Sequence, residues 1–137
     1  MLNFYNICIE GIDKSGKDTL LHYIDILSNH KFTIYTRGLI SNIAYSKIYN
    51  RNYEYNLDSD LNTIYVFLDV DYQDFLVRCN YTNEQLIDFK VHRQIFLDIV
   101  NQLKPRKTIF TYNTSEITPY NIAKEIIHNI NIMNKEK

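Results

Sequence analysis

The chain has 137 residues, of which 45% are hydrophobic and 23% are charged, and its formal net charge is −1. This charge argues against direct nucleic-acid binding through bulk charge, and no apolar stretch approaches the ~20 residues that span a bilayer. We therefore expect one domain over residues 1–132, a frayed tail over 133–137, and a cytoplasmic protein. Abundant Ile, Asn, Lys and Tyr, whose codons are rich in A and T, hint at a viral or phage source and hence at the host cytoplasm.

The first half of the chain alternates between strand and helix patterns. A β-branched and aromatic run predicts a strand over 4–10, and apolar residues at helical spacing predict a helix over 17–29. A second strand over 31–36 and a helix over 40–49 follow. Residues 49–62 are rich in Asn, Asp and Tyr, a composition typical of a surface loop.

The second half continues the alternation. Residues 63–70 form a nearly unbroken apolar run, which is typical of a central parallel strand buried on both faces. A short helix over 71–78 precedes a long helix over 82–103 that opens with a capping box. A strand over 108–112 and a final helix from Pro119 complete the pattern.

This order of elements, together with the G-x-x-x-x-G-K pattern at 11–17 between the first strand and the first helix, predicts an α/β protein with the three-layer fold of P-loop NTPases. We expect a short parallel sheet of about four strands, covered by helices on both faces, with ligands at the carboxyl ends of the strands. Cys8 and Cys79 belong to no metal or disulfide pattern, so both are expected to be free thiols. The histidines lack metal spacing and receive no role; they are His22, His30, His92 and His128.

Residues 11–17 carry the strongest chemical signal in the chain. Gly11, Gly16 and Lys17 satisfy the G-x-x-x-x-G-K pattern of a phosphate-binding loop, between a predicted strand and a predicted helix. Glycines let backbone N–H groups turn toward phosphate oxygens, while the lysine and the helix N-terminus add positive potential. A plain glycine turn with a solvated lysine is the alternative. The expected ATP-binding residues are Gly11, Asp13, Lys14, Ser15, Gly16, Lys17, Asp18 and Thr19.

Asp18 departs from the usual loop pattern, which places Ser or Thr after the lysine to bind Mg²⁺. Its carboxylate could ligate Mg²⁺ directly or through water, because Mg²⁺ prefers oxygen ligands, and Thr19 offers a hydroxyl one residue later. The same carboxylate could instead repel a triphosphate. Both readings stay open at the level of the sequence.

Residues 11–19, Gly-Ile-Asp-Lys-Ser-Gly-Lys-Asp-Thr, resemble the P-loop of thymidylate kinases and related deoxynucleoside monophosphate kinases. The Gly-Lys-Asp-Thr ending is also similar to that of some phage deoxynucleotide kinases. Residues 36–45 resemble the segment that holds the acceptor nucleotide in this family. Weaker matches cover 65–78, like the family's strand and the helix before its lid, and 113–115, like its adenine loop.

The resemblance implies a kinase of nucleotide biosynthesis that uses ATP and Mg²⁺ to phosphorylate dTMP or another deoxynucleoside monophosphate. It places Asp13 at the acceptor sugar, Arg37 at the acceptor phosphate, and Ser41 and Tyr45 beside the acceptor base. Lys14 takes the place of a catalytic Arg in one subclass. Positive groups offset the charge that develops during phosphoryl transfer, and the expected catalytic set is Lys14, Lys17, Arg37 and Arg78.

Each of these roles has a structural alternative. Lys14 and Arg37 could be ordinary surface residues, and Ser41 could simply cap the following helix. Arg78 could complement the dipole of the helix that it ends.

Four departures from the family pattern bear on activity. Thr36 stands where the family has an Asp, and Ser46 stands where a Gln reads thymine. The segment that usually separates the first helix from Arg37 is missing, which suggests a shortened form that lacks a quarter or more of the family domain. The lid is reduced to about 79–83 and contains no Lys or Arg.

Three hypotheses follow. The first is an active nucleotide kinase with ATP and a deoxynucleoside monophosphate as partners. The second is a weak or inactive kinase-derived protein that binds or senses nucleotides. The third is a protein-interaction module on a decayed P-loop fold, with Tyr49, Tyr53 and Tyr55 on its surface. A homodimer is expected in each case, because a truncated sheet leaves an edge to cover.

Overall fold

A computed structural model describes residues 3–78 and 83–135, and for 83–87 it describes the backbone alone. Strands and helices alternate along the described chain, as the sequence predicts. The elements are β1 (Asn6–Gly11), α1 (Lys17–Leu27), β2 (Thr33–Thr36), α2 (Leu39–Ile48), β3 (Thr63–Asp69), α3 (Tyr72–Arg78), α4 (Asn83–Leu103), β4 (Thr108–Asn113) and α5 (Pro119–Lys135).

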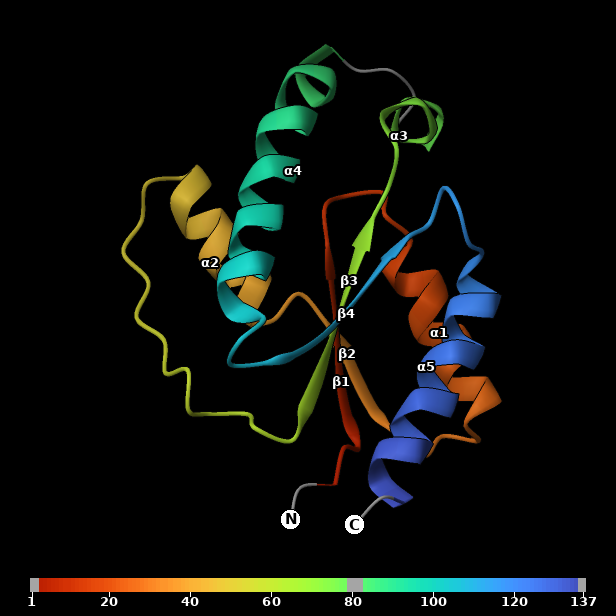
Figure 1. The fold of residues 1–137 in the computed structure, drawn as a ribbon. Helices are drawn as coiled ribbons and strands as arrows, with labels where there is room; N and C mark the ends of the chain where they lie inside the picture. The colour runs from red at the N-terminus through yellow and green to blue at the C-terminus, as the bar shows by residue number, and fades with distance from the viewer. Residues whose placement is uncertain (1–2, 79–82, 136–137) are drawn as a thin grey trace.

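The four strands form one parallel sheet in the order β2-β1-β3-β4. Figure 1 shows α1 and α5 on one face of this sheet and α2 and α4 on the other. The predicted three-layer α/β fold with about four strands is therefore confirmed. Because the strands are parallel, the loops that follow them gather at one edge of the sheet.

Side chains of β3 supply both cores by simple alternation. Ile64, Val66 and Leu68 belong to the apolar cluster that packs against α1 and α5, whereas Tyr65 and Phe67 belong to the cluster under α2 and α4. All five are at most 1% exposed. This two-sided burial explains the unbroken apolar run in the sequence and makes β3 the rigid centre of the fold.

Several element boundaries differ by one or two residues from the predicted ones, and two of these differences have a clear local reason. Helix α1 ends at Leu27 rather than Asn29, because Asn29 and His30 adopt left-handed backbone angles with φ of 56° and 61°. This turn also delays β2, which begins at Thr33 rather than Lys31. Residues 49–62 contain no helix or strand and are mostly exposed, as expected of a surface loop.

The predicted frayed tail begins too early, because α5 continues to Lys135. The Asn134 side chain accepts a hydrogen bond from the Phe4 backbone N–H (2.8 Å) and donates one to the Phe4 carbonyl (3.1 Å). These contacts tie the end of α5 to the segment before β1, and Figure 1 shows the end of α5 on the same side of the molecule as the start of β1. No described helix is both long and apolar enough to cross a bilayer.

Candidate functional site

The phosphate loop connects β1 directly to α1. Gly11 ends the strand with a φ of 150°, and a Cβ at this position would lie 2.5 Å from the Leu68 carbonyl oxygen. Gly16 caps α1 with a φ of 100°, which L side chains rarely adopt. Glycine is thus required at position 11 by the close approach of the Leu68 carbonyl, and at position 16 by the backbone angle.

Lys17 reaches back into the loop from the first turn of α1. Its amine donates to the carbonyl oxygens of Gly11 (2.9 Å) and Ile12 (2.7 Å) and contacts Ser15 Oγ at 3.4 Å. The side chain is only 5% exposed. Burial, reinforced by the charge of Arg37, lowers the pKa of Lys17 to about 8. The amine is therefore held at the loop in a strongly perturbed environment, as is common at functional sites.

Thr114, in the turn after β4, joins the loop to the rest of the sheet. Its hydroxyl is placed to donate to the Ser15 carbonyl (2.9 Å) and to the Asp69 carbonyl (3.2 Å), and its backbone N–H donates to the latter (2.9 Å). Arg78 donates to the Lys14 carbonyl (2.8 Å) and to Thr114 Oγ1 (3.0 Å). Arg78 thus contacts the phosphate loop itself, beyond any effect on the dipole of α3.

A cavity of about 380 Å³ lies over the phosphate loop. It brings together the cations Lys14, Lys17 and Arg37, and its remaining lining residues are Asp13, Gly16, Asp18 and Thr19. We call it the basic cavity. Most of the residues predicted to bind ATP therefore meet at one place, together with Arg37, which follows a different strand.

Arg37 pairs with Asp13 at 3.5 Å across the basic cavity, and both side chains are more than half exposed. A pair this exposed contributes little to stability, so its charges remain available to a ligand. Asp18 and Thr19 are exposed in the first turn of α1. The described residues contain no group of three or more His, Cys, Asp or Glu able to hold a metal.

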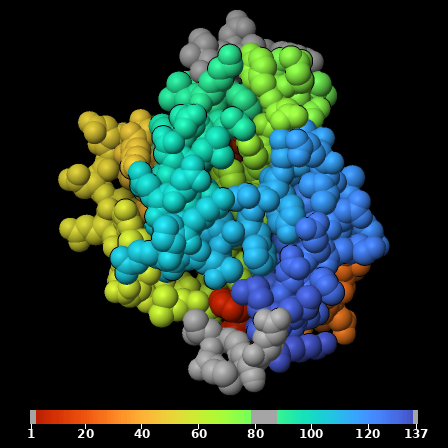
Figure 2. Space-filling view, in the orientation of Figure 1, coloured from red at the N-terminus to blue at the C-terminus, as the bar shows by residue number. Residues whose placement is uncertain are grey.

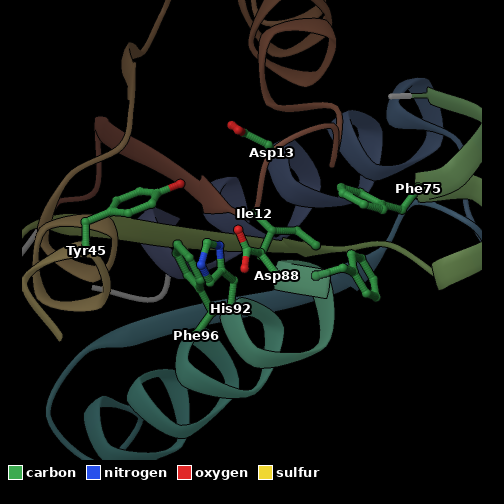
Figure 3. Close-up of a pocket in the computed structure, with 8 residues that line it drawn as sticks. Ile12, Asp13, Tyr45, Phe75, Asp88, His92 and Phe96 are labelled. Carbon is green, nitrogen blue, oxygen red and sulfur yellow. The ribbon is translucent and has the colours of Figure 1, made fainter. Parts of the chain in front are cut away.

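A second cavity of about 140 Å³ lies next to the loop and has mostly aromatic walls. Figure 3 shows Tyr45 on one side, Phe75 on another, and residues of α4 facing the loop. Tyr45 packs edge-on against Phe96, with ring centroids 5.9 Å apart. We call it the aromatic cavity; its lining residues are Ile12, Asp13, Tyr45, Phe75, Asp88, Phe89, His92 and Phe96.

Asp13 lines both cavities, and Tyr45 lines the aromatic one. Ser41 lines neither of them. It is 2% exposed, and its hydroxyl donates to Glu10 Oε1 at 2.5 Å. Ser41 does not cap the helix either, because the N-cap of α2 is Gly38. Its hydroxyl instead binds the buried carboxylate that accepts the backbone N–H groups at the start of α2.

That carboxylate, Glu10, was missed by the sequence analysis. It is fully buried and also accepts backbone N–H groups of Gly38 (3.0 Å), Ile40 (2.6 Å) and Ser41 (3.3 Å). Burial raises the pKa of Glu10, and the hydrogen bonds from these three N–H groups and from the Ser41 hydroxyl oppose the rise. A charged residue inside an apolar strand was the available signal, because such groups are buried only when they are bonded.

Arg93 was also missed. From α4 it donates to both carboxylate oxygens of Asp69, at 2.9 and 2.6 Å, and Asp69 is 15% exposed. The Asp69 carboxylate raises the pKa of Arg93. This pair links the carboxyl end of β3 to the helix that forms one wall of the aromatic cavity.

Some sequence expectations concern residues that the structure does not describe. The shortened lid at 79–83 lies largely outside the described residues, as do Cys79 and Thr82 of the capping box. Cys8 is a buried free thiol, as expected.

The fold and the loop together define a P-loop α/β architecture, and comparison with solved structures agrees. The YorR protein of Bacillus subtilis, solved in complex with phosphorylated GDP, is 15% identical, with a TM-score of 0.77 over 95% of this chain and 98% of that one. Thymidylate kinase from Candida albicans is 16% identical, with a TM-score of 0.61 over 98% and 94% of the two chains. Neither a protein-family model nor a curated protein sequence matches.

At these identities the likeness shows the fold. The alignment spans 94% of the Candida albicans chain, so this comparison gives no sign of the missing quarter that the sequence led us to expect.

Proposed function

We propose that the protein is a small nucleotide kinase that transfers the γ-phosphate of ATP to a deoxynucleoside monophosphate. One observation carries this proposal: the basic cavity over the phosphate loop and the aromatic cavity meet at Asp13. A donor triphosphate in the first and an acceptor base in the second would bring two phosphate groups together beside Asp13. Two structures with a similar fold support a nucleotide ligand, because one was solved in complex with phosphorylated GDP and the other is a thymidylate kinase.

Charge neutralisation in this scheme falls to three cations of the basic cavity. Lys17 would hold the donor phosphates, Arg37 the acceptor phosphate, and Lys14 the group in transit. Phosphoryl transfer depends mainly on positioning and on such neutralisation, so no covalent nucleophile is needed. Arg78 has a supporting part, because it holds the Lys14 carbonyl and lines a neighbouring cavity with Gly16 and Thr114.

Mg²⁺ fits the oxygen donors that the loop presents. Asp18 and Thr19 are exposed at the basic cavity, and Mg²⁺ is typically held by one or two carboxylates together with phosphate oxygens. Bound there, the ion would offset charge on the donor phosphates. Asp18 and Thr19 are the residues that would hold it.

The decisive experiment incubates the protein with ATP, Mg²⁺ and each of the four deoxynucleoside monophosphates and separates the products by ion exchange. A diphosphate product is expected, and Lys17→Ala should reduce its rate at least about 100-fold. Lys47→Ala is the matched control, because Lys47 is an exposed lysine on α2 outside both cavities. Unchanged transfer by Lys17→Ala would contradict the assignment.

The second hypothesis, nucleotide binding without efficient turnover, is favoured by one observation. Three atoms of the loop itself contact the Lys17 amine, so these contacts must be exchanged for phosphate oxygens before transfer. Titration with ATP separates the two functions. Tight binding without product favours the second hypothesis, whereas turnover at about 1 per second or faster excludes it.

The tyrosines of the third hypothesis pack partly on one another. Tyr53 stacks on Tyr55 at 5.7 Å and Tyr49 stacks on Tyr45 at 6.1 Å, yet all three loop tyrosines are at least 39% exposed. If the protein binds no nucleotide, the third hypothesis is favoured, with these exposed tyrosines as the candidate interaction surface. The expected homodimer remains a prediction, which light scattering at micromolar concentration tests.

A further inference from the structure

Two polar side chains interrupt the apolar walls of the aromatic cavity. Asp88 and His92 lie one turn apart on α4, and both line this cavity opposite the phosphate loop (Figure 3). The other walls include four aromatic rings, those of Tyr45, Phe75, Phe89 and Phe96. Asp13 stands at the mouth shared with the basic cavity. The sequence alone assigned no role to Asp88 or His92.

We propose that Asp88 and His92 read the acceptor base, and that this base carries an exocyclic amino group. The preferred acceptor is then dCMP, dAMP or dGMP rather than dTMP. This inference rests on the proposed function, because it assigns the aromatic cavity to the acceptor. It concerns the edge of the base, whereas the proposed function concerns the transfer of phosphate.

The argument begins with the chemistry of the two groups. An ionised carboxylate only accepts hydrogen bonds, whereas a neutral imidazole both donates and accepts. An amino group gives the Asp88 carboxylate an N–H donor, as in the pairing of Asp or Glu with cytosine N4. His92 then pairs with the ring nitrogen beside that amino group. Asp88 and His92 are thus both matched.

Thymine matches this pair poorly. Its single N–H lies between two carbonyl oxygens, so a carboxylate that approaches the N–H also approaches one of these oxygens. Repulsion between like partial charges then opposes binding. Asp88 is exposed and keeps water as a partner, so the discrimination comes from this repulsion rather than from desolvation of the carboxylate.

The size and shape of the cavity agree with a planar ring. A cavity of about 150 Å³ accommodates one benzene molecule, and the aromatic cavity measures about 140 Å³. One six-membered ring of a base therefore fits among the aromatic side chains, with the sugar directed toward Asp13. Stacking on an aromatic side chain favours binding of every base. Selection among bases must therefore come from the polar pair.

The test uses nucleotide pairs that differ at the amino group. Binding is titrated without donor for dCMP against dUMP and for dGMP against dIMP, and phosphate transfer is measured for the same compounds and for dTMP. The amino-bearing member of at least one pair should bind about tenfold more tightly or more. Transfer should show the same order, with dTMP as a poor acceptor.

Variants separate a reading role from a structural one. Asp88→Asn should reduce the amino preference and improve dUMP and dTMP, because an amide also donates to carbonyl oxygens. Asp98→Asn is the matched control on the same helix; Asp98 is exposed, bonds to Gln94 and lies outside the cavity. His92→Phe should weaken binding of the preferred nucleotide several-fold.

The outcomes distinguish the two proposals. This inference is overturned if the protein prefers dTMP, or if Asp88→Asn keeps the preference of the unmodified protein. The proposed function still stands in that case, provided that phosphate is transferred. Selective binding without transfer by the unmodified protein supports this inference and contradicts the kinase. Absence of binding for every monophosphate overturns both.

Discussion

The two cavities that meet at Asp13 are built in different ways. The basic cavity comes almost entirely from six residues of one short segment, 13–19, with Arg37 as its one contribution from elsewhere among the described residues. The aromatic cavity draws on the loop, α2, α3 and α4. Among its described lining residues, only two pairs are adjacent in sequence: Ile12 with Asp13, and Asp88 with Phe89. Backbone geometry shapes the first, whereas packing of distant side chains shapes the second.

This difference in construction predicts a difference in sensitivity. Changes at the phosphate loop should act on loop stability and donor binding, because the glycine conformations and the Lys17 contacts are local. Changes in the aromatic cavity should act on acceptor binding and leave the donor alone. In Figure 2, α4 covers much of the near face, and the space-filling surface there belongs largely to this helix and to β4 and α5. The helix that walls the aromatic cavity is thus also a major part of the molecular surface.

The largest effect is expected for Gly11→Ala in the loop. A Cβ there would lie 2.5 Å from the Leu68 carbonyl oxygen and 2.7 Å from Ser15 Oγ. We expect the free energy of unfolding to fall by about 3 kcal/mol, from steric overlap and an unfavourable φ. Urea unfolding measures it.

Gly16→Ala is the matched control for Gly11→Ala. A Cβ at Gly16 would meet only Thr114 Cγ2, at 3.9 Å, although its φ of 100° is also unfavourable. The expected loss is about 1–2 kcal/mol, from backbone strain alone. Equal losses in the two variants would show that close approach to β3 does not constrain the loop.

In the aromatic cavity, Tyr45→Ala should raise the KM for the acceptor about tenfold and leave the KM for ATP unchanged. The physical reason is loss of a ring that can stack on the base, which contributes about 1–3 kcal/mol. Steady-state kinetics with each substrate varied in turn measures the split. Tyr55→Ala is the control, because Tyr55 is 46% exposed, lies outside the cavity and stacks on Tyr53 rather than on Tyr45. A parallel rise in both KM values would remove the functional distinction between the two cavities.

Arg93→Ala tests whether the Asp69 pair stabilises the helix that walls the aromatic cavity. Asp69 is 15% exposed and would keep an unpaired charge, so we expect a loss of about 1 kcal/mol in unfolding free energy, limited by solvent screening of Arg93. Arg106→Ala breaks a pair with Asp58 in which both partners are more than half exposed. That loss should stay below about 0.5 kcal/mol. Chemical denaturation of the two variants compares them directly.

The same contrast between local and distant construction decides what could be predicted from the sequence. Order and type of the elements followed from periodicity, and β3 was recognisable because both of its faces are buried. Nearly all residues of the basic cavity could be predicted from the sequence, because they belong to one contiguous motif with a characteristic backbone geometry. Ser41 was placed beside the acceptor base, but the structure buries it against Glu10.

Glu10, Asp88 and Arg93 could not be assigned from the sequence for a common reason. Each depends on a partner or a wall more than 20 residues away, such as Gly38 for Glu10 and Asp69 for Arg93. Periodicity reports which face of an element is apolar, but it does not report which elements meet. Asp88 and His92 lie on a helix that the sequence predicts, but their position beside a cavity emerges only from the packing of α4 near the loop.

The smallest expected effect is a pH dependence that belongs to the basic cavity alone. Lys17 has a pKa lowered to about 8, and it binds phosphate best when charged. Its charged fraction falls about fourfold between pH 7 and pH 8.5, so ATP affinity should weaken by about that factor as pH rises through this window. Binding near pH 8 should take up protons, because phosphate oxygens favour the charged amine. Calorimetric titration in two buffers of different ionisation enthalpy measures this uptake.

Lys17→Arg sharpens this prediction, because a guanidinium remains charged throughout the window. The Arg variant should bind ATP with a flatter pH profile and without proton uptake near pH 8, whatever its absolute affinity. Lys47→Arg, on the exposed surface of α2, should keep the profile of the unmodified protein. Binding of the acceptor base in the aromatic cavity should not follow the Lys17 titration, because Lys17 does not line that cavity. If acceptor binding instead shifted in step with ATP binding, the two cavities would act as one electrostatic unit despite their different construction.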